Sequence, residues 1–412
     1  MKRRRVVITG LGVVAPNGIG KEEFWRNIKD GKSGIKKITS FDTSPYPIDI
    51  AGEISNFNPR NYMDEKIAFR TPRFGQFALV ATQEAITDAK LNLHYYKGEK
   101  VGVAIGTSMG GLYYALDQHN LFIKEGPLSI DSFITSIVVP SAATRAVSLA
   151  IGAKGSCMTF SSSCAASADA IGYGLNLIRK GEVDIMLVGG AESPINPPIF
   201  AGFCLSRILS SFKGEPIRVP RPFDLRRDGT AVGEGAAILV LEELKHAQER
   251  GAHVYTEIGG YASTCDSYHI VNPDPEGNQG VRAIVLALKD AGIKLEEVNY
   301  INAHGTGTVK NDQIETLIVK KVFKDRIYNI PISSTKSMTG HLLGASAAIE
   351  AAICTLAMQN NVIPPTINYQ EQDPQCDLDY VPNKARHQEV NIAISNSFGF
   401  GGFNAVLVIK KI

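Results

Sequence analysis

Residues 158–179 read Met158-Thr-Phe-Ser-Ser-Ser-Cys-Ala-Ala-Ser-Ala-Asp-Ala-Ile-Gly-Tyr-Gly-Leu-Asn-Leu-Ile-Arg179. This order favours a short strand, a tight polar turn and then a helix over 165–180. Cys164 would stand at the N-terminus of the helix, where unsatisfied N–H groups and the helix dipole stabilise a thiolate. Its own amide could also help to hold an oxyanion. The segment therefore predicts a strand–turn–helix unit that presents a nucleophilic cysteine.

Strand-like and helical stretches alternate through the rest of the chain. The expected strands are 101–105, 185–188, 237–241, 298–303, 392–395 and 405–409, and the further expected helices are 76–89, 242–250, 281–291, 312–323 and 347–359. This alternation predicts an α/β fold whose sheets are buried on both faces. Because 412 residues exceed one typical domain, we expect two α/β halves, over residues 1–252 and 253–412. A first buried strand is expected over Arg5–Thr9, followed by a glycine turn.

Composition and charge exclude several classes of function. The 43 basic and 41 acidic residues give a formal net charge of +2, which predicts no nucleic-acid partner but leaves open a local basic patch for an acidic partner. The six cysteines form no CxxC pair and are too sparse for a disulfide framework, so we expect no metal and a reducing, cytoplasmic location. The apolar stretch after the basic N-terminus is interrupted by Thr9, Gly10 and Gly12, so neither a signal peptide nor a membrane span is expected.

Two histidines and a lysine lie after expected strands in the second half. His304 lies in Asn302-Ala-His-Gly-Thr-Gly-Thr308, and Lys336 and His341 lie in Ser333-Ser-Thr-Lys-Ser-Met-Thr-Gly-His-Leu-Leu-Gly-Ala345. Ligand crevices open at the carboxyl ends of strands in α/β sheets. One such residue in a glycine-rich loop is usually structural, but the conjunction with Cys164 indicates a catalytic centre. Spacing alone does not show that these side chains converge.

These blocks resemble the signatures of the β-ketoacyl-[acyl carrier protein] synthases I and II, thiolase-fold condensing enzymes, with type II the more similar. The resemblance covers nearly the whole chain and rests on four blocks in order: the Ser-Cys-Ala-Ala-Ser turn at Cys164, Asn302–Thr308, Ser334–Ala345, and Asn396-Ser-Phe-Gly-Phe-Gly-Gly402. It implies a thiolase fold, in which two similar α/β halves stack as a five-layer αβαβα sandwich, normally in a homodimer. It also implies acyl carrier protein as partner, and no cofactor beyond the phosphopantetheine arm that carries the substrates.

The resemblance also implies a reaction, the decarboxylative Claisen condensation that elongates fatty acyl chains in type II fatty acid synthesis. Cys164 would take an acyl group from a phosphopantetheine thioester, and malonyl-acyl carrier protein would lose CO2 to give the carbanion that attacks it. Imidazole N–H groups of His304 and His341 suit the developing charge on the malonyl thioester oxygen, and the fixed charge of Lys336 would order the site. The amides of Cys164 and Phe400 would form the oxyanion hole, with Phe400 as a gate to the acyl site.

Further residues receive roles by the same resemblance. Thr306 and Thr308 would bind the pantetheine arm, and Met109 and Phe203 would line the acyl pocket. The basic residues that would meet the acidic carrier protein are Lys66, Arg70, Arg73 and Arg207.

Three departures from the family pattern leave the substrate open. Phe403 replaces the usual Thr after Gly-Phe-Gly-Gly, Val309-Lys-Asn-Asp312 replaces a Pro-containing stretch, and Ser346-Ala347 replaces a Gly-containing pair. The first two resemble ketosynthase subunits of type II polyketide systems, which work in a heterodimer with a chain-length factor. Such a polyketide or polyene ketosynthase is the alternative function. A thiolase is disfavoured because Ser397–Gly402 lacks a second cysteine, and a non-catalytic chain-length factor would lack Cys164.

Overall fold

The central sheet is built from strands of both halves, and the computed structural model describes residues 3–412. Within those residues the sheet has 11 strands in the order β11-β10-β14-β15-β9-β1-β8-β7-β5-β6, with β2 paired to β1. The strands of the first half are β1 (Val6–Ala15), β2 (Gly18–Ile19), β5 (Val101–Gly106), β6 (Cys157–Phe160), β7 (Ile185–Glu192) and β8 (Gly235–Glu243). Those of the second half are β9 (Thr256–Cys265), β10 (Tyr300–Asn302), β11 (Ile332–Ser333), β14 (Ile392–Gly399) and β15 (Phe403–Lys410).

The two halves of this sheet repeat one topology. If each half's five main strands are numbered along the chain, both halves have the spatial order 3-2-4-5-1. Strand directions also correspond: β5 pairs in parallel with β6 and β7, as β10 does with β11 and β14, and the remaining pairs are antiparallel. The halves meet at β1 and β9 through two residue pairs, Val7 with Glu257 and Ile8 with Thr256. The expected pair of similar α/β halves is therefore confirmed.

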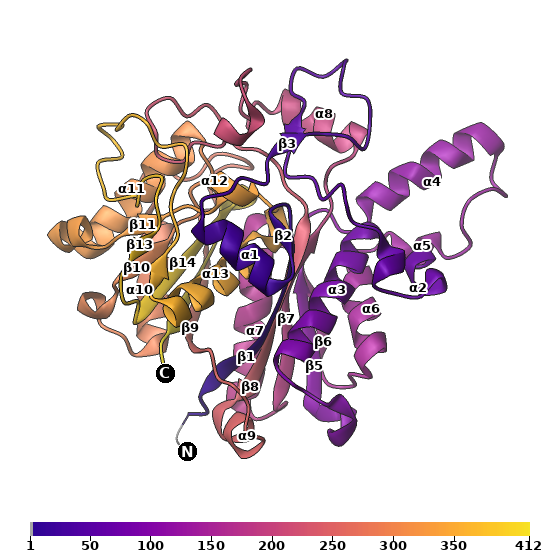
Figure 1. Cartoon of the computed structure of the whole chain (residues 1–412), viewed down its shortest axis with the longest axis horizontal. Helices are drawn as coiled ribbons and strands as arrows, with labels where there is room; N and C mark the ends of the chain where they lie inside the picture. Colours follow the sequence, from indigo (N-terminus) through magenta and orange to yellow (C-terminus); the bar gives the residue numbers. More distant parts are fainter. Residues whose placement is uncertain (1–2) are drawn as a thin grey trace.

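Helices cover both outer faces of the sheet and fill the space between its halves (Figure 1). On the first half, α3 (Arg73–Asp88) and α6 (Ala142–Ile151) bury their apolar sides against β1, β5 and β8. On the second half, α10 (Asn278–Ala291) and α11 (Val309–Phe323) pack on β10 and β14. Between the halves, α7 (Ala166–Lys180) and α13 (Ser346–Asn360) share the largest apolar core. These layers form the expected αβαβα sandwich.

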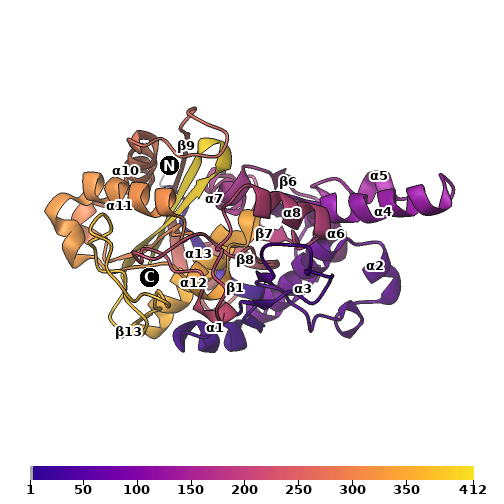
Figure 2. The ribbon, with the colours of Figure 1, turned by 90° about the horizontal axis from the view of Figure 1, so that it is seen from above.

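The remaining elements lie around this core. They are α1 (Lys21–Lys29), α2 (Glu65–Phe69), α4 (Leu112–Glu125), α5 (Ile134–Ile137), α8 (Pro197–Leu205), α9 (Leu244–Glu249), α12 (Lys336–Thr339), β3 (Lys36–Lys37), β4 (Ile50–Ala51), β12 (Val362–Ile363) and β13 (Arg386–His387). Helix α4 projects from the first half as an arm with α5 beside it (Figure 2). Across residues 3–412, helices fall short of the length and apolarity that a bilayer crossing requires.

The first strand differs from its prediction. Instead of turning at Gly10, β1 continues through Gly10 and Gly12 to Ala15. The glycines serve packing, because a Cβ would lie 2.2 Å from the Ala85 oxygen at Gly10 and 1.8 Å from the Ala81 oxygen at Gly12, both on α3. The expected helix 242–250 is also shorter, because residues through Glu243 belong to β8. The boundary at residues 252 and 253 falls between α9 and β9, and it remains a prediction.

Candidate active site

A sharp turn between β6 and α7 holds Cys164. The 3₁₀ helix Ser163–Ala165 joins the two elements, and Ser163 has a left-handed φ of 51°, which a non-glycine residue rarely adopts. Ser162 Oγ donates to Asp169, which also accepts the Tyr261 hydroxyl at 2.6 Å. On the opposite side the second half packs closely, since a Cβ on Gly399 would lie 3.0 Å from the Cys164 nitrogen. Both halves therefore fix the backbone of the cysteine.

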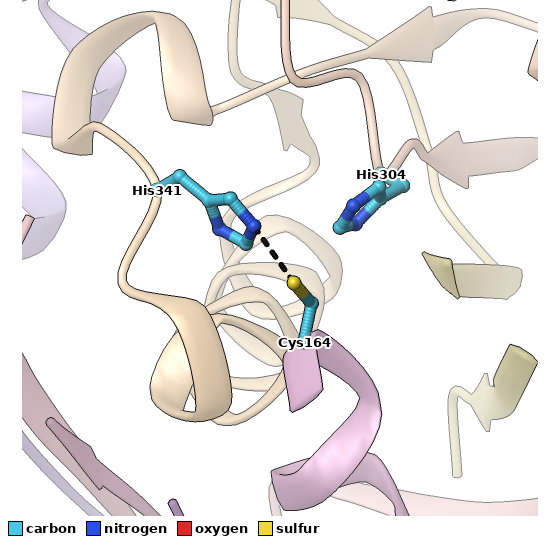
Figure 3. Close-up of side chains that lie close together, drawn as sticks. All are labelled: Cys164, His304 and His341. Atoms are coloured by element: carbon cyan, nitrogen blue, oxygen red, sulfur yellow. Dashed lines mark hydrogen bonds between the residues drawn. The ribbon is translucent and has the colours of Figure 1, made fainter. Parts of the chain in front are cut away.

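The structure brings Cys164, His304 and His341 together (Figure 3). His341 Nε2 lies 3.0 Å from Cys164 Sγ, and the sulfur and ring nitrogens of the three residues come within 4.8 Å of one another. The two imidazole rings are nearly perpendicular, with centroids 5.3 Å apart. Each histidine follows a strand of the second half, as expected: His304 follows β10, and His341 follows β11 and α12. The convergence that sequence spacing left open is present.

Burial keeps these three side chains uncharged. It lowers the pKa of His304 and of His341 well below the usual range, and the nearby charge of Lys336 lowers both further. Burial also raises the pKa of the Cys164 thiol to about 11, against lowering contributions from Lys336 and the Phe400 amide. The site therefore pairs a neutral thiol with two neutral imidazoles. Desolvation thus opposes the thiolate expected at this helix N-terminus, and that expectation remains a prediction.

A cysteine and two histidines at this spacing could also ligate a metal ion such as zinc. The local charge disfavours metal binding, because the Lys336 ammonium lies close enough to lower the pKa of all three residues. A hydrogen-bonding role fits this donor set better.

Lys336 acts on the site through its charge. It is 1% exposed at the start of α12, and its ammonium donates to Glu350 on α13. Burial raises the pKa of Glu350, and Lys336 opposes that rise. The ion pair thus ties the loop that carries His341 to the central helix layer.

Three buried glutamates hold the site, and none of them was predicted from the sequence. Glu315 accepts the amides of His304 at 2.8 Å and Gly305 at 2.7 Å. Glu192, at the end of β7, accepts the amides of Ser108, Met109 and Gly344 at 2.6, 3.0 and 3.2 Å. The third is Glu350. One signal existed: Glu350 is the only charged residue in the mostly apolar stretch 347–359, and a charge in a helix that is buried all round must be paired.

A cavity of about 330 Å³ opens onto Cys164 and both histidines. Thr306 and Thr308 line it, with their hydroxyl oxygens 2.9 Å apart, as do Phe203, Arg207 and Phe400. Phe400 is 38% exposed, and its amide lies close enough to Cys164 to lower the pKa of the thiol. Met109 lies outside the lining, in an apolar cluster that also contains the lining residues Phe203 and Leu343. The residues expected to bind the pantetheine arm therefore share one cavity with the reacting groups.

The four basic residues expected at the carrier-protein surface do not form one patch. Lys66 and Arg70 border a second cavity of about 740 Å³ beside α5, and Arg207 lies at the first cavity. Arg73 instead forms a bidentate pair with Glu234, at 2.6 and 2.9 Å, and stacks over Phe77. The prediction for Arg73 is therefore corrected to a structural role, because its guanidinium is held by a buried carboxylate.

All three departures lie at or beside the site. Phe403 is 39% exposed and packs its ring against Gly401, next to Phe400. Ser346 begins α13 and places its Oγ 2.9 Å from His341 Nδ1. Val309 begins α11 and lines the cavity, and Asp312 on that helix accepts the amide of Phe223 at 2.8 Å.

Comparison with known proteins supports the expectation drawn from the sequence. Residues 3–247 match the N-terminal domain of the β-ketoacyl synthases, and residues 255–370 match their C-terminal domain. The chain is 44% identical over 411 residues to proteins of Synechocystis sp. and Staphylococcus aureus named 3-oxoacyl-[acyl-carrier-protein] synthase 2, covering 100% of this chain and 99% of each relative.

Solved structures agree over the full length of the chain. A type II polyketide ketosynthase, in complex with its acyl-carrier protein and bound to the hexaketide, is 38% identical with a TM-score of 0.92. The ishigamide ketosynthase/chain length factor is 37% identical with a TM-score of 0.93. Each comparison covers 100% of both chains. The thiolase fold expected from the sequence is confirmed, and the chain belongs to the β-ketoacyl synthase family.

Proposed function

We propose that this chain is a 3-oxoacyl-[acyl-carrier-protein] synthase that elongates fatty acyl chains by decarboxylative Claisen condensation. The observation that carries the proposal is the buried cluster of one thiol and two neutral imidazoles, with donor atoms within 4.8 Å, at the end of a cavity. The full-length relatives named synthase 2 support the fatty acid pathway.

The first half-reaction loads the enzyme. Cys164 sulfur attacks the carbonyl of an acyl thioester, and the pantetheine thiol leaves with the proton that the cysteine gives up. The amides of Cys164 and Phe400 are suited to hold the intermediate oxyanion, since the Phe400 amide lies close enough to the reacting sulfur to lower the pKa of the thiol. Thr306 and Thr308 offer hydroxyls to the pantetheine arm in the same cavity.

The second half-reaction forms the carbon–carbon bond. Malonyl thioester loses CO2, and the electron pair of the broken C–C bond becomes an enolate whose oxygen accepts hydrogen bonds from His304 and His341. Neutral imidazoles suit this step, because each keeps one N–H and a buried donor stabilises new charge strongly. The enolate carbon then attacks the Cys164 thioester, and the cysteine leaves and takes up one proton. These steps need no cofactor or metal beyond the carrier's phosphopantetheine.

Acyl carrier protein and a second copy of the chain are the proposed partners. Arg207 at the cavity, with Lys66 and Arg70, offers positive charge to an acidic carrier, and the similar ketosynthase structure that contains an acyl-carrier protein supports this pairing. A homodimer is supported by β6, which ends the sheet and exposes Met158 at its edge. A cytoplasmic location is supported by six cysteines that are all free within residues 3–412.

A polyketide or polyene ketosynthase subunit is the second candidate. Phe403 and Val309 favour it, and so do the two ketosynthase structures from specialised systems. Such a subunit would pair with a chain-length factor in place of a second copy. The Phe403→Thr variant tests this candidate by its preference for acyl chain length. An unchanged preference would show that Phe403 has only a packing role.

The deciding experiment traps the acyl group on Cys164. The protein is incubated with carrier proteins that carry acyl chains of graded length, and the adduct is identified by mass spectrometry of the peptide. Saturated chains of many lengths on Cys164 support fatty acid elongation, and a strict preference for polyketide or polyene intermediates supports the second candidate. An adduct that survives in Cys164→Ala would overturn the nucleophile assignment.

A further inference from the structure

Both ring nitrogens of His341 have a partner, and the ring is held by its backbone. The His341 amide donates to the Ala231 oxygen at 2.7 Å, and its carbonyl accepts the Gly233 amide at 2.9 Å. On the ring, Nε2 lies 3.0 Å from Cys164 Sγ, and Nδ1 lies 2.9 Å from Ser346 Oγ. Cys164, His341 and Ser346 are each 5% exposed or less. Water therefore has little part in deciding which nitrogen carries the proton.

A neutral imidazole has one N–H and one acceptor nitrogen, so the position of a single proton decides what His341 can do. With the proton on Nδ1, Nε2 could act as a base toward the Cys164 thiol. With the proton on Nε2, the ring donates toward the sulfur and toward an oxygen bound beside it. Burial and Lys336 lower the His341 pKa and exclude the doubly protonated ring near neutral pH. The choice therefore lies between these two tautomers.

Ser346 decides between them. Within residues 3–412, the Ser346 hydroxyl has His341 Nδ1 as its hydrogen-bond partner and no other side-chain or backbone acceptor. If Nδ1 carried the proton, the hydroxyl hydrogen would be buried without an acceptor, which is the costlier arrangement. If the hydroxyl donates to Nδ1, both groups are satisfied. His304 differs, because its Nδ1 is buried without a hydrogen-bond partner in the described chain.

We propose that Ser346 is a positioning residue whose hydroxyl donates to Nδ1 of His341 and fixes this histidine as the Nε2–H tautomer. His341 is thereby a donor to Cys164 sulfur and to the enolate oxygen, and not the base that activates the thiol. Ser346 belongs to the pair at which this chain departs from its family pattern. The proposal rests on the role given to His341 under the proposed function.

The test compares the wild-type protein with Ser346→Ala and Ser346→Thr. Two-bond 15N–1H spectra of protein labelled in its eight histidines separate protonated from unprotonated ring nitrogens, and His341→Ala identifies the His341 signals. We expect protonated Nε2 in wild type and Ser346→Thr, and a mixed signal in Ser346→Ala. Thr355→Val serves as matched control, because it removes another buried hydroxyl from α13 without contact to His341.

Kinetics provide the second measurement. Ser346→Ala should lower kcat for malonyl-carrier decarboxylation about 3- to 10-fold with little change in KM, the scale of one neutral hydrogen bond, and Ser346→Thr should restore it. Protonated Nδ1 in the wild-type spectrum would overturn the proposal, as would an unchanged tautomer and kcat in Ser346→Ala. An inactive wild-type protein with protonated Nε2 would instead refute the proposed function and leave the tautomer assignment standing.

Discussion

The buried thiol of Cys164 makes a quantitative prediction about its reactivity. Burial raises its pKa to about 11, so that at pH 7, four pH units lower, about one molecule in 10⁴ carries the thiolate. A thiol with the ordinary pKa of about 8.5 would be about 3% ionised at that pH. Because the thiolate is the species that reacts with iodoacetamide, Cys164 should be alkylated a few hundredfold more slowly, roughly, than an ordinary thiol. Its rate should rise about tenfold per pH unit between pH 7 and 10.

The assay follows one peptide. The protein is treated with iodoacetamide at a series of pH values, and the modified Cys164 peptide is quantified by mass spectrometry, with exposed Cys265 in the same digest as a reagent control. The double variant Lys336→Met/Glu350→Gln removes the Lys336 charge that lowers the Cys164 pKa together with the smaller opposing effect of Glu350, and it leaves no carboxylate of this pair unpaired. Its profile should therefore shift modestly to higher pH. A wild-type rate already constant between pH 7 and 8 would refute the reasoning, since it would show that the helix N-terminus and the Phe400 amide outweigh burial.

Three further predictions address the histidines, the buried ion pair and the pH dependence of stability. His304→Ala or His341→Ala should slow decarboxylation by roughly 10²–10³-fold, the scale for losing one oxyanion donor; unchanged release of labelled CO2 would show that another group stabilises the enolate. Lys336→Met leaves Glu350 buried without its partner and should lower the free energy of unfolding, measured in urea, by about 3–5 kcal/mol. The double variant Lys336→Met/Glu350→Gln should lose less stability, and equal losses in the two variants would contradict the pairing argument. Burial raises the pKa of Glu84 from 4.5 to about 7, so its contribution to stability is full below pH 4.5 and is lost as the pH rises through 7; urea titrations between pH 4.5 and 8 should show a flatter profile for Glu84→Gln, and an identical profile would speak against the assignment.

The sequence predicted those parts of the site that rest on local patterns. Cys164 lies in a strand–turn–helix segment, and His304 and His341 follow short strands, so periodicity and glycine-rich loops were enough to find them. Their convergence within 4.8 Å depends on how the two halves of the chain pack, which only the family resemblance anticipated. The order of elements was likewise readable, because apolar strands and amphipathic helices differ in period.

Burial is the property that the sequence left hidden. A cysteine at a helix N-terminus suggests a thiolate, and only the packed site shows that desolvation dominates. Gly10 and Gly12 suggested a turn, because the local sequence does not indicate that the backbone of α3 packs against them. Arg73 was predicted to be a surface cation, because its partner Glu234 lies 161 residues away in the sequence and their contact is not visible from local patterns.

The amide clamp at Glu192 limits how this enzyme can open. Its carboxylate, at the end of β7, binds Ser108 and Met109 from the first half and Gly344 from the second, so it bridges the seam on which the reacting groups meet. Of these bonds only the one from Gly344 crosses between the halves, and a hinge motion would break it and separate α7 from α13, which share the largest apolar core. This packing therefore disfavours the domain closure that many two-lobed enzymes use. Substrates must be admitted by local movement at the rim, where the half-exposed Phe400 and Phe403 lie, while the catalytic floor stays rigid.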